Sequence, residues 1–81
     1  MTTQIYTLYD RVASQCENIW HARNDPDAQR SFLKRFENRK DFDDFALLHI
    51  GEFDHDTGNF YPLDIPDEIP TSRKSEEEKQ L

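Results

Sequence analysis

One short stretch of this 81-residue sequence, GEFDHDTGNF, contains the residue types that begin a calcium-binding loop, namely Asp54, Asp56 and Gly58. Such a loop has a glycine at its sixth position and a bidentate glutamate at its twelfth. Counted from Asp54, these positions hold Asn59 and Ile65. Both flanks of the stretch are typical of strands. The spacing therefore predicts a hairpin turn with Gly58 at positive φ, and not a metal site.

The other residues capable of chemistry are scattered. His21, His49 and His55 lack the spacing of a metal-binding pair, and Cys16 is the single cysteine. We expect Cys16 to be a packing residue and His49 to be a packed or rim residue. No serine-centred or glycine-rich phosphate motif is present. The sequence therefore predicts no enzyme, no bound metal and no cofactor.

The composition allows only one small domain with a thin core. Hydrophobic residues make up 35% of the chain and the mean hydropathy is −0.99, so the six Phe, three Tyr and one Trp must supply most of the apolar area. A homodimer would bury more, although the sequence does not require one. No apolar run could span a membrane and no signal peptide is recognisable, which together with the single cysteine favours a reducing cytoplasm.

Four segments are rich in β-branched and aromatic residues. We expect strands at residues 5–13, 18–22 and 45–53, and a short fourth strand in the sequence NFYPL at residues 59–63. Because Pro62 has no backbone N–H group, this last strand should lie at an edge or an end.

A helical period replaces the strand pattern at residues 26–38. Asp25 is the predicted N-cap and Pro26 suits the first helical position. Arg30 and Lys34 fall on the face opposite the apolar stripe. The predicted stripe consists of Ala28, Phe32, Leu33 and Phe36.

These elements predict an α+β fold, in which a small antiparallel sheet of three to four strands packs against one main helix. The domain should occupy residues 1–65. After Ile65 the composition shifts to spaced prolines and charges, so residues 66–81 are expected to form a mobile charged tail, with a capping-box pair at Ser75 and Glu78.

The net charge of −7 is unevenly distributed. Residues 41–68 hold nine acids and no Lys or Arg, whereas residues 23–40 have a net charge of +3. Such a dipolar molecule could dock a basic partner or touch phosphates with one side only, and Tyr6, Trp20 or another exposed aromatic residue could stack on an unpaired base. The candidate phosphate-binding residues are Arg23, Arg30, Lys34, Arg35, Arg39 and Lys40.

The alternative for this basic block is an ordinary solvated helix face. Arg30 and Lys34 would then pair partly with Glu37 and with the acids of residues 41–44. The sequence pI of about 4.7 favours this alternative, because an acidic protein is repelled by a polyanion.

Several fragments together resemble the small non-structural protein of gokushoviruses, the single-stranded DNA phages of the Microviridae. The fragments are YDRVA at residues 9–13, ARND at residues 22–25, Ala28, Arg30 and Phe32 in the helix, and IGEFDHDTG at residues 50–58. Their order and spacing are similar over about residues 6–60.

The resemblance implies a role in phage DNA replication in the cytoplasm of the bacterial host, at the switch from double-stranded copying to single-stranded synthesis. It implies weak DNA binding and brings no catalytic residue or cofactor. The alternative is an acidic interaction module that binds a phage or host replication protein without touching DNA.

Overall fold

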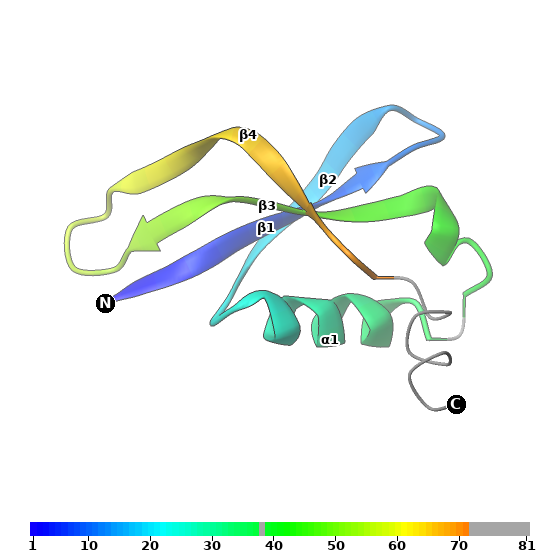
Figure 1. Ribbon diagram of the computed structural model, residues 1–81, viewed down its shortest axis with the longest axis horizontal. Coiled ribbons are helices and arrows are strands. Elements are labelled where there is room, and N and C mark those ends of the chain that lie inside the picture. The colour runs from blue at the N-terminus through cyan, green and yellow to red at the C-terminus, as the bar shows by residue number, and fades with distance from the viewer. Residues whose placement is uncertain (38, 72–81) are drawn as a thin grey trace.

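The fold is known from a computed structural model, which describes residues 1–37 and 39–71. In this part of the chain, four strands form one antiparallel sheet in the order β2-β1-β3-β4, accompanied by one α-helix (Figure 1). The predicted α+β class is confirmed. The elements are β1 (Thr2–Asp10), β2 (Gln15–Ala22), α1 (Asp25–Arg35), the 3₁₀ turn η1 (Phe42–Asp44), β3 (Phe45–Asp54) and β4 (Phe60–Ile69).

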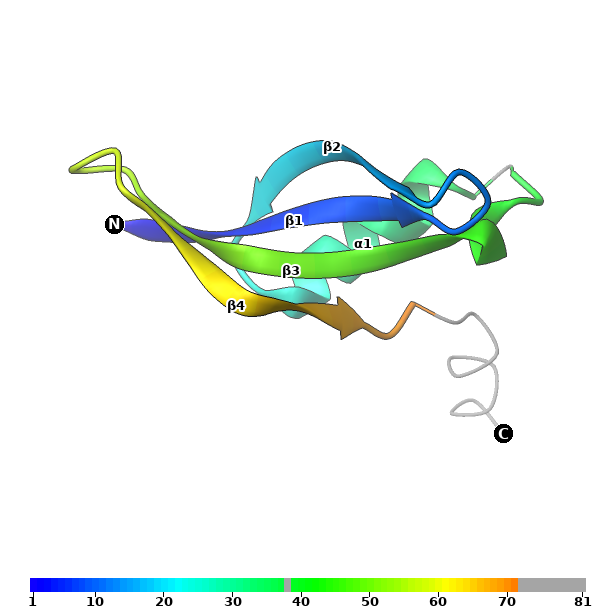
Figure 2. The same cartoon turned by 90° about the horizontal axis from the view of Figure 1, so that it is seen from above.

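The helix covers only one face of the sheet. Figures 1 and 2 show α1 on one side, with the other side of the strands uncovered. Successive side chains of a strand point to opposite faces, and on β1 the fully buried Tyr6 and Leu8 belong to the core beneath the helix. Thr7, between them, therefore lies on the face away from α1. We call this second surface the open face.

The core forms where the apolar stripe of α1 meets the sheet. Phe32 and Phe36 are fully buried with ring centroids 4.8 Å apart, and the Phe36 ring lies 5.0 Å from that of Phe45 on β3. Leu33 is half-buried beside them, so the predicted stripe is confirmed. The buried cluster consists of Tyr6, Leu8, Ala22, Ala28, Phe32, Phe36, Leu47 and Ile69.

The start of α1 differs by one residue from the prediction. Asn24, not Asp25, is the N-cap, and its side-chain oxygen accepts the Asp27 N–H at 3.0 Å. Asp25 instead accepts a hydrogen bond of 2.7 Å from the Tyr6 hydroxyl on β1. This bond fastens the first turn of the helix to the sheet.

The ends of α1 and β1 also differ from the sequence-based bounds. The helix ends at Arg35 and not at residue 38, with Phe36 as its C-cap. β1 begins and ends about three residues earlier than expected, because the Asp10 carboxylate accepts the N–H groups of Val12 and Ala13 and turns the chain there.

β4 is longer than predicted and continues past residue 65, where the sequence predicted the end of the domain. The strand extends to Ile69, which pairs with Leu47 and is only 4% exposed. Burial of one isoleucine under the sheet thus holds residues 66–69 in the domain, despite their polar composition. Pro62 lies on an edge strand, as predicted. The remaining tail prediction, including Ser75 and Glu78, falls on residues 72–81, outside the described residues.

Candidate nucleic-acid interface

The stretch that suggested a calcium loop is the turn between β3 and β4. Asp54 accepts the N–H of Asp56 through its carboxylate at 2.9 Å and the N–H of Gly58 through its carbonyl at 2.8 Å. Gly58 has φ of +81°, the left-handed conformation that glycine adopts readily. The Asp56 N–H group holds the pKa of the Asp54 carboxyl below its usual range. The predicted turn is confirmed.

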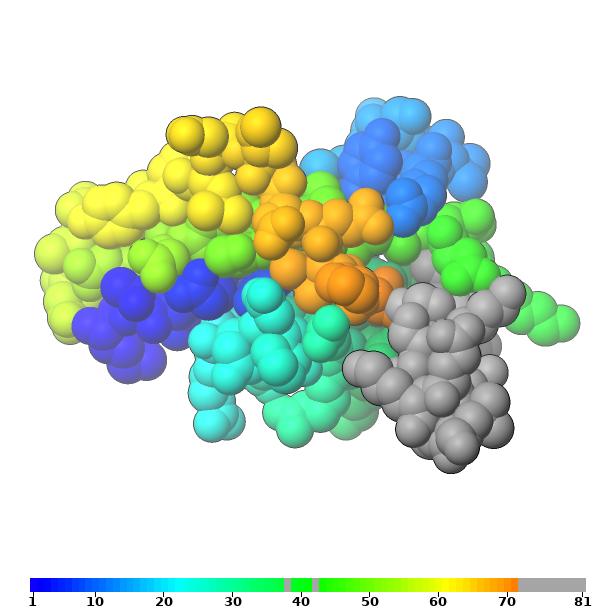
Figure 3. Space-filling view, viewed as in Figure 1, coloured from blue at the N-terminus to red at the C-terminus, as the bar shows by residue number. Residues whose placement is uncertain are grey.

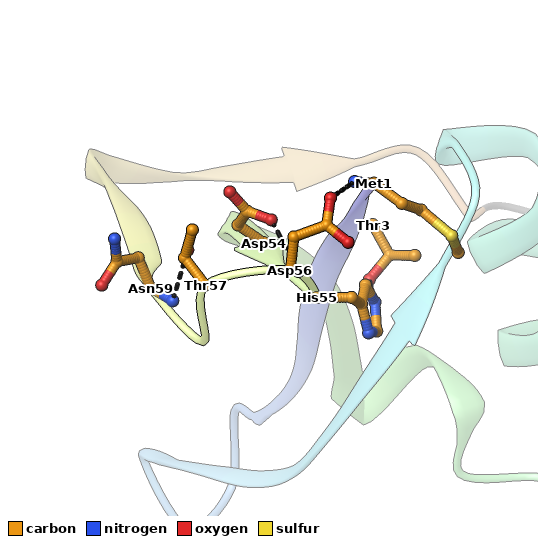
Figure 4. A network of polar contacts seen from close by, with 7 residues as sticks. All are labelled: Met1, Thr3, Asp54, His55, Asp56, Thr57 and Asn59. Carbon is orange, nitrogen blue, oxygen red and sulfur yellow. Dashed lines mark hydrogen bonds and ion pairs between the residues drawn. The ribbon is translucent and has the colours of Figure 1, made fainter.

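The remaining polar groups of this turn have partners within the chain. The Asp56 carboxylate pairs with the amino group of Met1, and the His55 ring lies 2.9 Å from the Thr3 hydroxyl (Figure 4). Among residues 1–37 and 39–71, no group of three His, Cys, Asp or Glu side chains is arranged to hold a metal ion.

Cys16 and His49 have different surroundings. Cys16 is exposed near the start of β2, so the prediction that it packs in the core is wrong. The reason is that Cys16 pairs with Tyr9 on the open face, where no second layer covers it. His49 is half-buried, with its ring 5.1 Å from that of Tyr6 and its Nε2 atom 2.7 Å from the Gln4 amide oxygen. It is the packed rim residue that the sequence predicted.

The six candidate phosphate-binding residues are all exposed, but two of them are paired. Arg30 contacts the Asp27 carboxylate one turn earlier at 2.5 Å, which lowers the pKa of Asp27. The predicted pairing of Arg30 with Glu37 or with residues 41–44 is therefore wrong. The reason is local, because side chains three residues apart are neighbours on a helix.

Arg39 is held in place beyond the end of α1. Its guanidinium donates to both oxygens of Asp41 at 2.9 and 2.6 Å and lies 4.8 Å from the centre of the Phe36 ring. The Asp41 carboxylate raises the pKa of Arg39, and the guanidinium in turn lowers the pKa of Asp41. Arg39 therefore stabilises the segment that connects α1 to β3, and its guanidinium is less available to bind a phosphate.

The other four cations point into solvent. Within the described residues they form no ion pair. At 100° per residue, Arg30 and Lys34 lie near each other on the outer side of α1, opposite the buried stripe, and Arg23 precedes the N-cap of the helix. Arg23 and Arg30 also line an open hollow of about 330 Å³ at the start of the helix. We call the surface formed by Arg23, Arg30, Lys34, Arg35 and Lys40 the cationic face.

The aromatic residues proposed for base stacking are not available. Tyr6 is fully buried with its hydroxyl bound to Asp25, so its predicted stacking role is wrong. Trp20 packs against the core, and its indole N–H is buried without a partner among the described residues. Among the side chains that the structure describes, the exposed aromatic rings are Phe60 and Tyr61 on β4, 45% and 51% exposed. The sequence did not single them out, because an edge strand can expose either of its two faces.

These features define a small α+β domain with a cationic helix on one side, acidic strands elsewhere, and an uncovered sheet face. A family model described as phage ORF5 protein matches residues 3–74, so the chain belongs to the phage ORF5 protein family. No curated protein and no solved structure matches it. No helix in the described part of the chain is both long and apolar enough to cross a membrane.

Proposed function

We propose that this phage protein is the small non-structural protein of a gokushovirus and acts in the production of single-stranded DNA in the host cytoplasm. Its role would be binding and not catalysis, and the cationic face would make a weak contact with single-stranded DNA. Membership of the phage ORF5 family and the sequence resemblance support the setting. The four solvent-facing cations around α1 are the observation that carries the DNA contact.

The cationic face is suited to positioning phosphates because α1 is fixed. Its apolar stripe is buried, its first turn is capped by Asn24, and Asp25 is bonded to Tyr6 on the sheet. Lys34 and Arg30 therefore project from a rigid element, and little further order has to be imposed on the backbone when they meet a phosphate.

The same surface also limits the strength of the contact. Asp27 lies between Arg23 and Arg30 and neutralises part of their charge, while residues 41–68 repel a polyanion. The contact should involve only a few phosphates. Each contributes roughly 0.7 to the slope of log K against log salt for a single strand.

Charge reversal on one side of the molecule tests the proposal. Lys34→Glu should weaken binding of a labelled single-stranded oligonucleotide in fluorescence anisotropy at low salt and reduce the salt slope. The control is Arg11→Glu, which makes the same charge change at the β1–β2 turn, where the Arg11 side chain is also exposed. Equal losses of oligonucleotide affinity in both variants would mean that only the net charge of the protein matters. The cationic face would then not be the DNA-binding surface.

Asp27→Asn provides the opposite change. Removing this carboxylate frees Arg30 and deletes a negative charge from the cationic face. Oligonucleotide binding should therefore become tighter, and unchanged binding would place the contact elsewhere.

The second candidate is an acidic interaction module for a phage or host replication protein. Asp64, Asp67 and Glu68 are exposed on β4, a strand without Lys or Arg. If the protein binds no DNA at low salt and instead co-purifies with a replication protein from infected cells, this candidate replaces the first. Charge reversal of these acids should then release the partner.

A further inference from the structure

The open face of the sheet carries exposed apolar side chains around a few small residues, such as Thr7 and Ala46, that their neighbours already bury. Thr7 lies between two core-facing residues of β1, so it points to the open face. Ile19 and Leu48 pair with Thr7, and Ile5 is two residues away on the same strand, so all three lie on this side. Ile19 is 71% exposed. At the far end, Phe60 pairs with Phe53 and remains 45% exposed.

A segment of β4 rises from this face. Between the pairs His49–Asp67 and Gly51–Pro62, residues 63–66 of β4 stand opposite only Ile50, so they leave the regular ladder. Figure 1 shows the resulting arch on the side of the sheet away from α1. Ile65 in this segment is 80% exposed and Leu63 is 38% exposed. An isoleucine held in solvent within this arch is a candidate for burial against another surface.

The open face also has a matching depression. In Figure 3, the β4 arch and the β1–β2 turn both rise on this side, and a gap separates them above β3. A surface with one ridge beside one depression can meet its own copy across a two-fold axis, with each ridge placed in the other's depression.

Most of the charge on the open face is neutralised by one ion pair. The only ion pair on the open face among the described residues joins Arg11 to Glu68 at 3.5 Å, so the two charges cancel. This pair therefore does not repel a second copy, and the arch of β4 adds one exposed acid, Asp64, to the same face.

The available area is enough for a modest dimer. Four strands about 4.8 Å apart and about 30 Å long present roughly 550 Å² per copy, so a pair would bury about 1,100 Å². This lies just below the range of stable protein–protein interfaces, which begins at about 1,200 Å², and is typical of a weak association. We therefore propose that the open face binds a second copy of this chain, sheet to sheet, giving a two-fold dimer of about micromolar strength.

The dimer would place the two helices on opposite outer surfaces, because α1 lies on the other side of each sheet. If the cationic face binds DNA as proposed above, each dimer has two DNA contacts that face away from each other. It could then hold two segments of single strand at once, and the weak single contacts would be strengthened by avidity.

Sedimentation equilibrium of the full chain without DNA, from low to high micromolar concentration, tests the dimer independently of DNA binding. The parent should change from monomer to dimer over this range. Ile19→Glu and Ile65→Glu should each shift the dissociation constant at least tenfold towards monomer. The matched control, Ser31→Glu, adds the same charge at an exposed position of α1 and should leave the dimer intact.

Circular dichroism of the two variants checks that they remain folded, so that a loss of dimer cannot be ascribed to unfolding. Both isoleucines are exposed, so their replacement should preserve the fold. A parent that stays monomeric throughout the range overturns the proposal, as does a dimer that Ile19→Glu and Ile65→Glu leave unchanged. Either result leaves the proposed DNA contact standing, because that contact is measured on Lys34 variants.

Discussion

The two faces of the sheet show how unevenly one short helix stabilises this chain. On the covered face, Tyr6 and Leu8 are fully or nearly fully buried beneath Phe32. On the open face, Ile19 remains mostly in solvent although it lies in the same sheet. A domain needs two packed layers around its core, and α1, with 11 residues, supplies the second layer on one side only. The stability of the single chain should therefore come almost entirely from the covered face.

The largest expected difference is between truncations on the two faces. Phe32→Ala should lower the free energy of unfolding by about 3–5 kcal/mol, because it empties a fully buried site between α1 and the sheet. Ile19→Ala should change it by less than about 0.5 kcal/mol at concentrations where the chain is monomeric. Urea unfolding followed by the fluorescence of Trp20 measures both. Comparable losses in the two variants would mean that the open face is also a packed core surface.

The covered face was predictable from sequence because its signals are local. Ala28, Phe32 and Phe36 repeat every four residues, and this period both predicts the helix α1 and identifies its buried side. The turn at Gly58 was predictable for a similar reason, since a glycine among Asp and Thr between two apolar runs specifies a hairpin. Each of these signals is complete within about twelve residues of sequence.

Other features depend on contacts between distant or side-chain groups that no local pattern records. Nothing in the sequence places Ile69 opposite Leu47, so the polar composition of the last residues of β4 predicts a tail. Tyr6 belongs to a strand whose two faces look equally apolar, and only the position of α1 decides that its ring is buried. The pairing of Asp27 with Arg30 is visible only in the side-chain geometry.

Gly51 tests whether any part of the open face is closely packed. A Cβ atom there would lie 2.5 Å from the Tyr61 carbonyl oxygen and 2.8 Å from the Phe60 ring. Because the nearest atom belongs to the backbone of β4, Gly51→Ala should separate the two strands locally and cost about 1–3 kcal/mol. Gly58→Ala meets no atom within 4 Å and should cost about 1 kcal/mol through its positive φ alone. Thermal unfolding should rank the two in that order, and the reverse order would contradict close packing at Gly51.

A smaller effect is expected for the one polar anchor of the covered face. Tyr6→Phe removes the hydrogen bond to Asp25 but keeps the ring, so the loss should be about 0.5–1.5 kcal/mol. Burial, aided by Asp25, raises the pKa of the Tyr6 phenol well above its usual range. The unfolded chain therefore loses this proton near pH 10 while the folded protein keeps it.

The sign of the pH dependence follows from this difference. The stabilisation from Tyr6 is fully present below about pH 10 and falls as the pH rises further, because only the unfolded state releases the proton. Urea unfolding between pH 8 and about pH 11 should show a decline in the parent that is weaker in Tyr6→Phe. Parallel declines would assign the alkaline loss to other groups.

The smallest effect concerns the ion pair between Arg11 and Glu68 on the open face. The two side chains are 47% and 61% exposed and their charged atoms are 3.5 Å apart, so water screens their attraction. A double-mutant cycle with Arg11→Gln and Glu68→Gln, followed by urea unfolding of dilute protein, should give a coupling energy of about 0–1 kcal/mol. The same cycle at high protein concentration sharpens the contrast between the faces. If a second copy covers the open face, the pair loses water and its coupling should grow, whereas an uncovered face leaves the coupling independent of concentration.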